Sequence, residues 1–167
     1  MIKLKSLKTK NLTKKIIQNI LLLKDETWRN GLTSQQKHFK INYKNNDYHN
    51  LMFYKNVLIG YTSFRKRKIK TTREEKSYLL LDSIVIKKKF REKGYSSNLM
   101  KYNNHFLIKK GLKNLLFCTN KNVKFFSKYQ WKIANKKNFI LTNYFSRKKI
   151  MTFKFKIKKN TIYSILI

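Results

Sequence analysis

One segment of the sequence constrains the fold more than any other. A hydrophobic run, Ser77 to Ile86, precedes a basic turn, Lys87 to Gly94, and the small hydroxyl residues Ser96 and Ser97 follow the turn. Such an apolar run is typical of a buried central strand, and the serines suit the start of a helix. The N–H groups of a turn and a helix N-terminus attract anions, and glycine allows close approach of a phosphate. The segment predicts a diphosphate-binding turn, although a lysine-rich loop entering a helix would give a similar pattern.

This turn belongs to a chain that is basic throughout, with 41 Lys and Arg, 7 Asp and Glu, and a formal net charge of +34 at pH 7. A disordered basic tail is excluded because 41% of the residues are hydrophobic and 14% are aromatic. Lys, Asn, Ile, Phe, Tyr and Met, which have A/T-rich codons, supply 96 of the 167 residues. Codon drift thus explains much of the lysine, but it does not explain the shortage of acids, so an anionic partner remains open.

Length and cysteine content limit the class of protein further. A chain of 167 residues is typical of one domain, which we place at residues 1–167. The single cysteine, Cys118, excludes a disulfide framework, and three scattered histidines exclude a zinc finger, so we expect no metal. No apolar run is long enough to span a membrane. We expect a cytoplasmic protein in which Cys118 is a small core residue rather than a nucleophile, because no histidine lies near it in the sequence.

The first half of the chain predicts helices followed by a hairpin. Residues 16–23 have helical apolar spacing that Lys24 and Asp25 close, although the basic stretch before them also resembles a transit peptide. Residues 33–36 match a capping box, which predicts a second helix to about Lys44. Residues 51–54 and 57–64 predict a hairpin that turns at Lys55-Asn56 and is followed by a polar connection over residues 65–76. Gly60 is either a weak point of its strand or the site of a bulge or close backbone approach.

The second half predicts alternating elements, which place the chain in the α/β class. Residues 96–110 keep one apolar face at helical spacing, and Gly111 suits a left-handed cap. We further predict a strand over 115–119, a short helix over 122–129, and closing strands over 139–141 and 151–157.

Two motifs in this order resemble the GNAT superfamily of acyl-CoA-dependent N-acetyltransferases. Arg91-Glu92-Lys93-Gly94-Tyr95-Ser96 fits the family's Arg/Gln-x-x-Gly-x-Gly/Ala turn, and residues 125–131 keep its aromatic-x-Lys-x-x-aromatic frame after Asn120. The resemblance covers roughly residues 13–157. It implies a single-domain fold with a mixed, mostly antiparallel sheet, whose splayed central strands are flanked by helices.

The resemblance also implies acetyl-CoA as co-substrate. The pantetheine arm would bind backbone groups of Ile84 and Ile86 in the gap between the strands that end at Ile86 and Cys118. An N–H group there would face the thioester oxygen as negative charge develops on it. The diphosphate would rest on the N–H groups of residues 93–97, with Arg91 screening its charge and Asn120 adding a contact. These cofactor-binding candidates are Ile84, Ile86, Arg91, Lys93, Gly94, Tyr95, Ser96, Ser97 and Asn120.

Catalytic side chains are harder to assign. Asp82 occupies a strand position at which family members often have a general base, although it could instead bond a loop or a lysine. Phe126 replaces the tyrosine that protonates the departing thiolate in many members, and Gln130 replaces a glycine. Either Tyr129 or solvent would then supply that proton, and Tyr129 also suits a packing role. The interval from Asn120 to Phe126 is one residue shorter than usual, which leaves the contact of Asn120 open.

The acceptor is less defined than the donor. The resemblance places Trp28, Asp47 and His49 near the acceptor pocket, although solvated loop polarity explains each of them more simply. The acceptor would be a small-molecule or peptide amine, and the basic charge favours an anionic one, such as a nucleotide-linked amino sugar, over a polyamine. Two rival functions remain: a nucleic-acid-binding protein with interleaved lysines and aromatics, and a GNAT-like domain that binds CoA without catalysis.

Overall fold

The computed structural model describes residues 1–141 and 148–166 and forms two compact units. Unit 1 consists of Met1–Arg65 and Ser83–Asn103, and unit 2 consists of Lys66–Asp82 and the described residues from Asn104 onward. The helices are α1 (Lys14–Trp28), α2 (Leu32–Asn42), α3 (Tyr95–Lys110) and α4 (Asn120–Ser127). The strands are β1 (Ile2–Lys8), β2 (Tyr48–Tyr54), β3 (Val57–Lys70), β4 (Glu75–Ile86), β5 (Lys113–Cys118), β6 (Lys132–Ile133), β7 (Phe139–Ile140), β8 (Lys149–Phe153) and β9 (Tyr163–Leu166).

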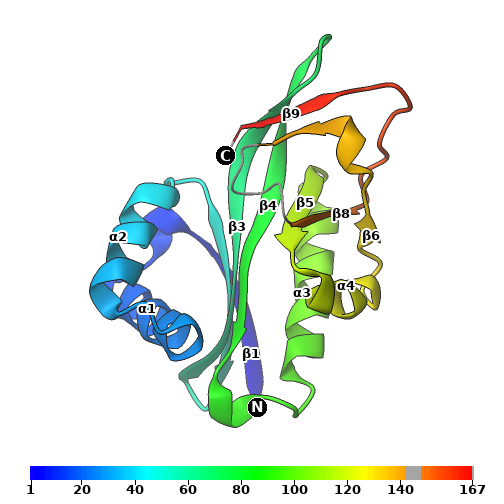
Figure 1. Cartoon of the computed structure of the whole chain (residues 1–167). Helices are drawn as coiled ribbons and strands as arrows, with labels where there is room; N and C mark the ends of the chain where they lie inside the picture. Colours follow the sequence, from blue (N-terminus) through cyan, green and yellow to red (C-terminus); the bar gives the residue numbers. More distant parts are fainter. Residues whose placement is uncertain (142–147, 167) are drawn as a thin grey trace. The chain divides into compact units, whose positions relative to one another are not determined.

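The strands form a mixed sheet (Figure 1). By residue range, β3, β4 and α3 each contribute to both units. The strand order is β1-β2-β3-β4-β5-β8-β6, and β9 pairs with β3 and β7. The β4–β5 and β7–β9 pairs are parallel, whereas β1–β2, β2–β3, β3–β9, β5–β8 and β6–β8 are antiparallel. The predicted α/β class with a mixed, mostly antiparallel sheet is confirmed.

Unit 1 has an apolar layer on each face of its strands. Consecutive strand residues point to opposite faces, so Leu51 and Met52 of β2 belong to different layers. On one face, Ile20 and Leu23 of α1 pack against Leu51 and its neighbours. On the other face, Leu99 of α3 packs with Met52 and the end of β4. The strands of unit 1 are therefore held between α1 and the first turns of α3.

The first helix is longer than predicted. Thr13 caps it, because its hydroxyl oxygen accepts a hydrogen bond from the Ile16 N–H at 3.3 Å. Lys24 and Asp25 do not close the helix, which continues to Trp28. The side chain of Lys24 is buried, and its Nζ atom lies 5.7 Å from the Trp28 ring and 5.6 Å from the ring of Tyr43. A buried lysine whose ammonium group lies near aromatic rings is compatible with a helix interior, which the charge pattern alone did not indicate.

The predicted capping box of the second helix is wrong. The N-cap of α2 is Gly31, whose N–H donates to Asp25 Oδ1 at 2.7 Å, and Thr33 lies inside the helix. The helix also ends at Asn42, before the predicted Lys44. The N-cap is thus a glycine bonded to a carboxylate of α1, six residues earlier, and the hydroxyl of Thr33 does not have the capping role predicted for it.

The hairpin between β2 and β3 is confirmed. Lys55 has φ 46° and Asn56 has φ 63°, the two positive values that a tight two-residue turn requires. The polar connection predicted over residues 65–76 is wrong, because β3 continues to Lys70 and β4 begins at Glu75. The burial of β3 alternates beyond residue 64, so that basic residues occupy inward positions and hide the strand pattern.

Gly60 marks both a bulge and a close approach. The register between β2 and β3 shifts after the Met52–Gly60 pair. A Cβ atom on Gly60 would lie 2.9 Å from Ile86 Cδ1, 3.1 Å from Met52 Cβ and 3.4 Å from Leu99 Cδ2. Glycine at this position thus lets the end of β4 and the first turns of α3 pack closely on the strand.

Unit 2 forms around one large core cluster, which includes Tyr78, Leu115, Ile150 and Tyr163. Cys118, also in unit 2, is buried as predicted, and burial raises the pKa of its thiol. The predicted closing strand over 151–157 is observed as β8, which ends at Phe153, and α4 begins two residues before its predicted start. The short strands β6 and β9, as well as β1 in unit 1, were not predicted.

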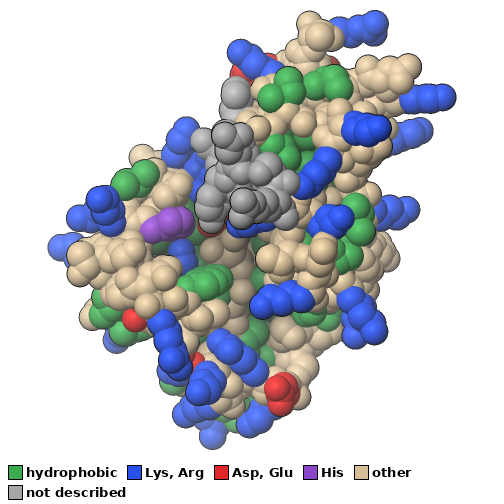
Figure 2. All heavy atoms as spheres, in the orientation of Figure 1, with side chains coloured by type: hydrophobic (Ala, Val, Ile, Leu, Met, Phe, Trp, Pro, Cys, Tyr) green, Lys and Arg blue, Asp and Glu red, His purple; other side chains and the backbone are tan. Residues whose placement is uncertain are grey.

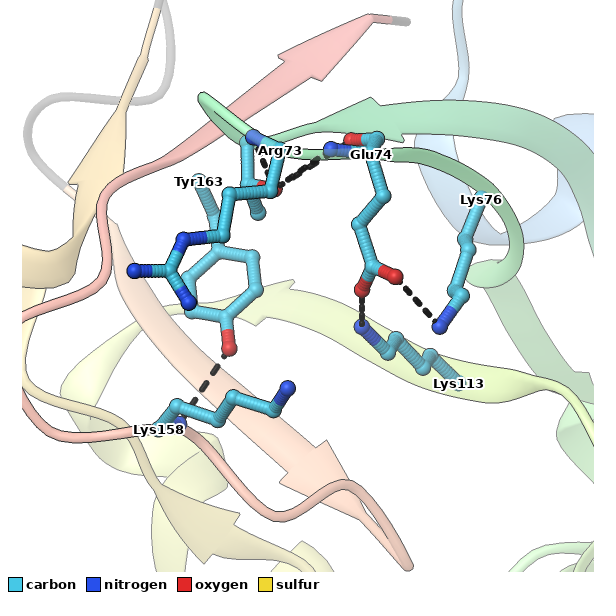
Figure 3. Close-up of polar contacts among 7 residues, drawn as sticks. Arg73, Glu74, Lys76, Lys113, Lys158 and Tyr163 are labelled. Atoms are coloured by element: carbon cyan, nitrogen blue, oxygen red, sulfur yellow. Dashed lines mark hydrogen bonds and ion pairs between the residues drawn. The ribbon is translucent and has the colours of Figure 1, made fainter.

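A network of ion pairs joins the turn between β3 and β4 to β5 within unit 2. The Glu74 carboxylate contacts Lys76 Nζ at 2.6 Å and Lys113 Nζ at 3.9 Å (Figure 3). The hydrogen bond from Lys76 and the nearby lysine charges lower the pKa of Glu74. Lys113 Nζ also lies 4.8 Å from the ring of Phe155 and 5.3 Å from the ring of Tyr163. Burial lowers the pKa of this lysine.

Candidate active site

The turn that follows β4 is held by backbone and side-chain bonds within unit 1. The N–H of Lys87 donates to Ile59 O at 2.8 Å, and a short 3-10 helix then runs from Lys88 to Phe90. Glu26 of α1 accepts a hydrogen bond from the Lys88 N–H. Ile84 and Ile86, the predicted pantetheine contacts, precede this turn, and Ile84 is half-buried whereas Ile86 is buried.

Gly94 provides the backbone conformation that joins the turn to α3. Its φ is +78°, and its carbonyl accepts the Asn98 N–H at 3.2 Å, which makes it the residue before the first helical turn. Helix geometry leaves the N–H groups of the first turn, residues 95–97, without partners four residues back. Glu92 also has a positive φ of 62°. Residues 91–94 are exposed, so this turn and helix N-terminus can accept an anion from solvent.

The observed contacts of Arg91 differ from its predicted role. Its Nε donates to Ile86 O and its Nη2 to Thr27 Oγ1, both at 2.9 Å. Arg91 therefore ties the turn to the end of β4 and to the last turn of α1, which uses two of its five N–H donors. Lys93 is exposed and has no such tether among the described contacts. Thr27 and Glu26 were not predicted to contribute, because nothing in the spacing of α1 links it to a turn some 60 residues later.

Aromatic side chains support the same turn. The ring of Phe90 lies 5.9 Å from the ring of Tyr95 and 5.8 Å from that of Tyr54. Tyr95 and Phe90 also pack against the cluster that contains Ile86 and Leu99. The start of α3 is thus fixed by packing as well as by the two bonds of Arg91.

Of the three predicted acceptor contacts, only Trp28 is accessible. Trp28 is 41% exposed at the end of α1, whereas Asp47 and His49 are both 0% exposed. Asp47 Oδ2 accepts the Lys44 N–H at 2.9 Å. Contact between an acceptor and either buried side chain would require this part of unit 1 to open.

His49 has an internal bond at each ring nitrogen. Nδ1 lies 2.8 Å from the Tyr61 hydroxyl and Nε2 lies 2.9 Å from Thr9 Oγ1. Burial, with a smaller contribution from the Lys24 charge, lowers its pKa to about 4. The imidazole is consequently neutral at pH 7, and both of its nitrogens are occupied by hydroxyl groups.

A separate groove of about 680 Å³ lies in unit 1 along α1 and α2. Its floor includes Ile17, Leu21 and Phe39. Neither Trp28 nor the buried pair Asp47 and His49 is among the described residues that line it. The predicted acceptor contacts therefore do not converge on this groove.

The remaining predicted residues belong to unit 2. Asp82 is half-buried and follows the last residue of β4 that pairs with β5, Leu81. The first residue of β4, Glu75, is a second carboxylate on this strand. Asn120 is the first residue of α4, and Phe126 on the same helix is buried.

Tyr129 follows α4 and has structural contacts. Its N–H donates to Phe126 O at 2.9 Å, its carbonyl accepts Asn104 Nδ2 at 2.8 Å, and its ring lies 5.4 Å from that of Phe125. Gln130 comes next, with φ 66°, which is the left-handed conformation that glycine adopts most easily. Gln130 therefore replaces the family's glycine at a position whose left-handed backbone conformation favours glycine.

Within the described ranges 1–141 and 148–166, no group of three or more His, Cys, Asp and Glu side chains could hold a metal ion. None of the helices described is both long and apolar enough to cross a membrane.

Comparison with known proteins assigns the family. A sequence model of the acetyltransferase (GNAT) family matches residues 17–130, more than half of the chain, and the chain belongs to this family. The match includes the turn from Arg91 to Ser97 and the helix α4. A search of curated proteins found no match.

Solved structures show the same fold at low sequence identity. An acyl-CoA N-acyltransferase from Pseudomonas aeruginosa superposes with a TM-score of 0.68 at 13% identity, over 91% of this chain and 99% of that one. PaiA N-acetyltransferase from Thermoplasma acidophilum, solved in complex with coenzyme A, gives 0.60 at 14% identity, over 93% and 99%. The ribosomal-protein-S18-alanine N-acetyltransferase from Escherichia coli gives 0.61 at 12% identity, over 99% and 94%.

Proposed function

We propose that this protein is an N-acetyltransferase that transfers the acetyl group of acetyl-CoA directly to an amine. The observation that carries the proposal is the turn after β4, where Gly94 at φ +78° opens α3 and Arg91 is bonded to the strand end. We propose that residues 1–167 act as one domain, in the cytoplasm.

The turn and the start of α3 supply the donor site in this proposal. The N–H groups of Lys93, Gly94, Tyr95, Ser96 and Ser97 bind the diphosphate of coenzyme A, and Lys93 screens its charge. Ile84 and Ile86 offer backbone groups to the pantetheine arm. A backbone N–H of this strand stabilises the oxyanion that develops when the amine attacks the thioester carbonyl. The carbon–sulfur bond then breaks and the thiolate leaves.

Proton transfers require a base and an acid. An amine is mostly protonated at pH 7, and Asp82 accepts its proton in the proposed reaction. Phe126 cannot donate a proton to the departing thiolate. Solvent therefore supplies this proton, with Tyr129 as the alternative donor, and Asn120 is retained as a candidate contact of coenzyme A.

Isothermal calorimetry with coenzyme A tests the donor site. We expect saturable 1:1 binding that persists at 0.15 M salt, because backbone donors in a fixed turn do not depend on long-range charge alone. No heat at concentrations that saturate other acyltransferases would remove the donor site, and the enzyme assignment with it.

Replacing Asp82 tests the base. Asp82→Asn is expected to leave the affinity for acetyl-CoA unchanged and to lower turnover by about a hundredfold. The remaining activity is expected to rise with pH, because at higher pH a larger fraction of the amine is already deprotonated and does not need a catalytic base. Turnover equal to wild type with a saturating amine would exclude Asp82 from the mechanism.

The acceptor is proposed to be a small anionic amine or a nucleotide-sugar amine. Figure 2 shows Lys and Arg side chains across the face drawn, with few acids among them. A field of this sign concentrates anions and repels polyamines. A panel of amines assayed by release of the coenzyme A thiol tests this ranking, and preference for spermidine over an amino-sugar nucleotide would reverse it.

The alternative functions each have one supporting observation. The net charge of +34 favours a nucleic-acid-binding protein, and the absence of the family's tyrosine at Phe126 favours a domain that binds coenzyme A without catalysis. Binding of random oligonucleotides that survives physiological salt supports the first alternative. Thermal stabilisation by acetyl-CoA without thiol release for any amine supports the second.

A further inference from the structure

A row of polar side chains crosses three neighbouring strands of unit 1. Ser6 of β1 pairs with Asn50 of β2, and Asn50 pairs with Thr62 of β3, so the three side chains point to the same face of the sheet. Asn50 and Thr62 are both 0% exposed, and Met52, two residues further along β2, belongs to the apolar cluster of that face. We call Ser6, Asn50, Thr62 and Asn103 of α3 the polar row.

Asn103 connects this row to the helix above it. Its Oδ1 accepts Asn50 Nδ2 at 2.8 Å, and its Nδ2 donates to Thr62 Oγ1 at 2.9 Å. Ser6 Oγ donates to Asn50 Oδ1 at 2.6 Å and lies 3.0 Å from the hydroxyl of Tyr102. The two ends of one buried amide, itself 0% exposed, are thus bonded to two different strands.

This arrangement fixes where α3 lies along the sheet. Leu99 and Tyr95 stand four and eight residues before Asn103, so the three side chains form one stripe on the helix. The Leu99 and Tyr95 contacts are apolar, and apolar contacts permit small sliding and rotation. A shift of one residue moves a helix by about 1.5 Å along its axis and would break both bonds between Asn103 and the strands. Buried polar groups tolerate such a loss poorly, so the row selects a single position.

We infer that Asn103 is a positioning residue for the donor site. By fixing the position of α3, it fixes the first-turn N–H groups at Tyr95, Ser96 and Ser97, two turns away on the same rigid helix. This inference rests on the proposed function, since its consequence is read as affinity for coenzyme A. A merely structural row would contribute to stability and leave that affinity unchanged.

The experiment replaces the row by apolar side chains of similar size. The triple variant Asn50→Leu/Thr62→Val/Asn103→Leu removes both partners of each bond between Asn103 and the strands. Ser6 loses its bond to Asn50 Oδ1 but keeps the Tyr102 hydroxyl at 3.0 Å. We expect a folded protein whose melting temperature is equal to or above that of wild type. Its affinity for coenzyme A is expected to fall by about tenfold, because first-turn N–H groups of α3 that are out of position bind the diphosphate less well.

A matched control comes from unit 2. Asn114 is also a buried asparagine, and its Nδ2 donates to Phe153 O at 3.1 Å. Asn114→Leu is expected to change stability without changing the affinity for coenzyme A. If the triple variant and this control bind coenzyme A equally well, the positioning role is overturned.

A milder variant covers the case in which the triple variant does not fold. Thr62→Val removes one of the two bonds between Asn103 and the strands, and an affinity equal to wild type in this folded variant overturns the proposal. A second readout does not need coenzyme A. The amide signals of Ser96 and Ser97 in two-dimensional NMR spectra are expected to move in Thr62→Val but not in Asn114→Leu. Failure of wild type to bind coenzyme A would refute the proposed function, whereas unmoved amide signals would refute the positioning role.

Discussion

At the scale of single residues, the fold shifts the pKa of one side chain and fixes an unusual backbone conformation at another residue. His49 is buried with a pKa of about 4, and Gln130 adopts a left-handed backbone conformation with φ 66°. Neither state could be predicted from the sequence. His49 lies in a polar stretch that is typical of a solvated loop. At residue 130 the sequence shows only that glutamine replaces the family's glycine, and it does not show the backbone conformation.

The burial of His49 makes folding stability depend on pH. The pKa is about 4 in the folded protein and about 6.5 in the unfolded chain, so the unfolded state binds the proton first as pH falls. The stability that depends on neutral His49 is complete above pH 6.5 and is lost between pH 6.5 and 4. This loss lowers the free energy of unfolding by about 3 kcal/mol. Urea unfolding at pH 7.5 and pH 4.5 measures it. His49→Gln is expected to flatten this dependence, whereas His105→Gln, an exposed position, is expected to keep it. An unchanged slope in His49→Gln would contradict the assignment.

The conformation of Gln130 predicts a stabilising substitution. Glycine has no Cβ to clash in the left-handed region, so Gln130→Gly is expected to raise the free energy of unfolding by about 0.5 kcal/mol. The gain is small because glycine also increases the entropy of the unfolded chain. Thermal unfolding measures it, and Gln130→Ala serves as the control that keeps the Cβ. Equal stabilisation by alanine would show that the backbone conformation is not the cause.

At the scale of elements, the sequence was sufficient where local chemistry decides the structure. The central strand β4, the turn with Gly94 and the helix α3 were predicted, because an apolar run, a glycine and a helix cap act within a few residues. The strand β1 and the far half of β3 were missed, because lysines and arginines take alternate positions along them. The contacts that complete the site, such as Arg91 with Thr27, depend on tertiary packing and left no local signal.

The two ends of α3 offer a test of the donor site. Gly94 before the helix has φ +78° and Gly111 after it has φ +62°, and a Cβ at either position meets open space. An alanine at either end therefore costs about 1 kcal/mol of backbone strain without a steric clash. Gly94→Ala is expected to weaken coenzyme A binding by about fivefold, whereas Gly111→Ala is expected to change only stability. Calorimetry with both variants decides, and an equal effect at both ends would argue against a diphosphate on this turn.

At the scale of the whole molecule, the charge of +34 opposes folding through self-repulsion. The ion pairs of Glu74 and Glu75 with lysines relieve this repulsion locally in unit 2. Salt screens the remainder, so the melting temperature is expected to rise between 10 and 300 mM sodium chloride. Differential scanning fluorimetry follows the change. A melting temperature that falls with salt would show that attractive ion pairs dominate instead. Guanidinium chloride is an unsuitable denaturant for such measurements, because it is itself a salt and screens the charges while it unfolds the protein.

The lysine-covered surface in Figure 2 also bears on any assay of the proposed reaction. Each exposed lysine is itself a primary amine. The protein's own lysines therefore compete with an added amine for the acetyl group. Acetylation of these side chains would consume donor without added substrate and would progressively neutralise the molecule. Intact mass spectrometry after incubation with acetyl-CoA alone would therefore report both a background rate and a gradual loss of positive charge.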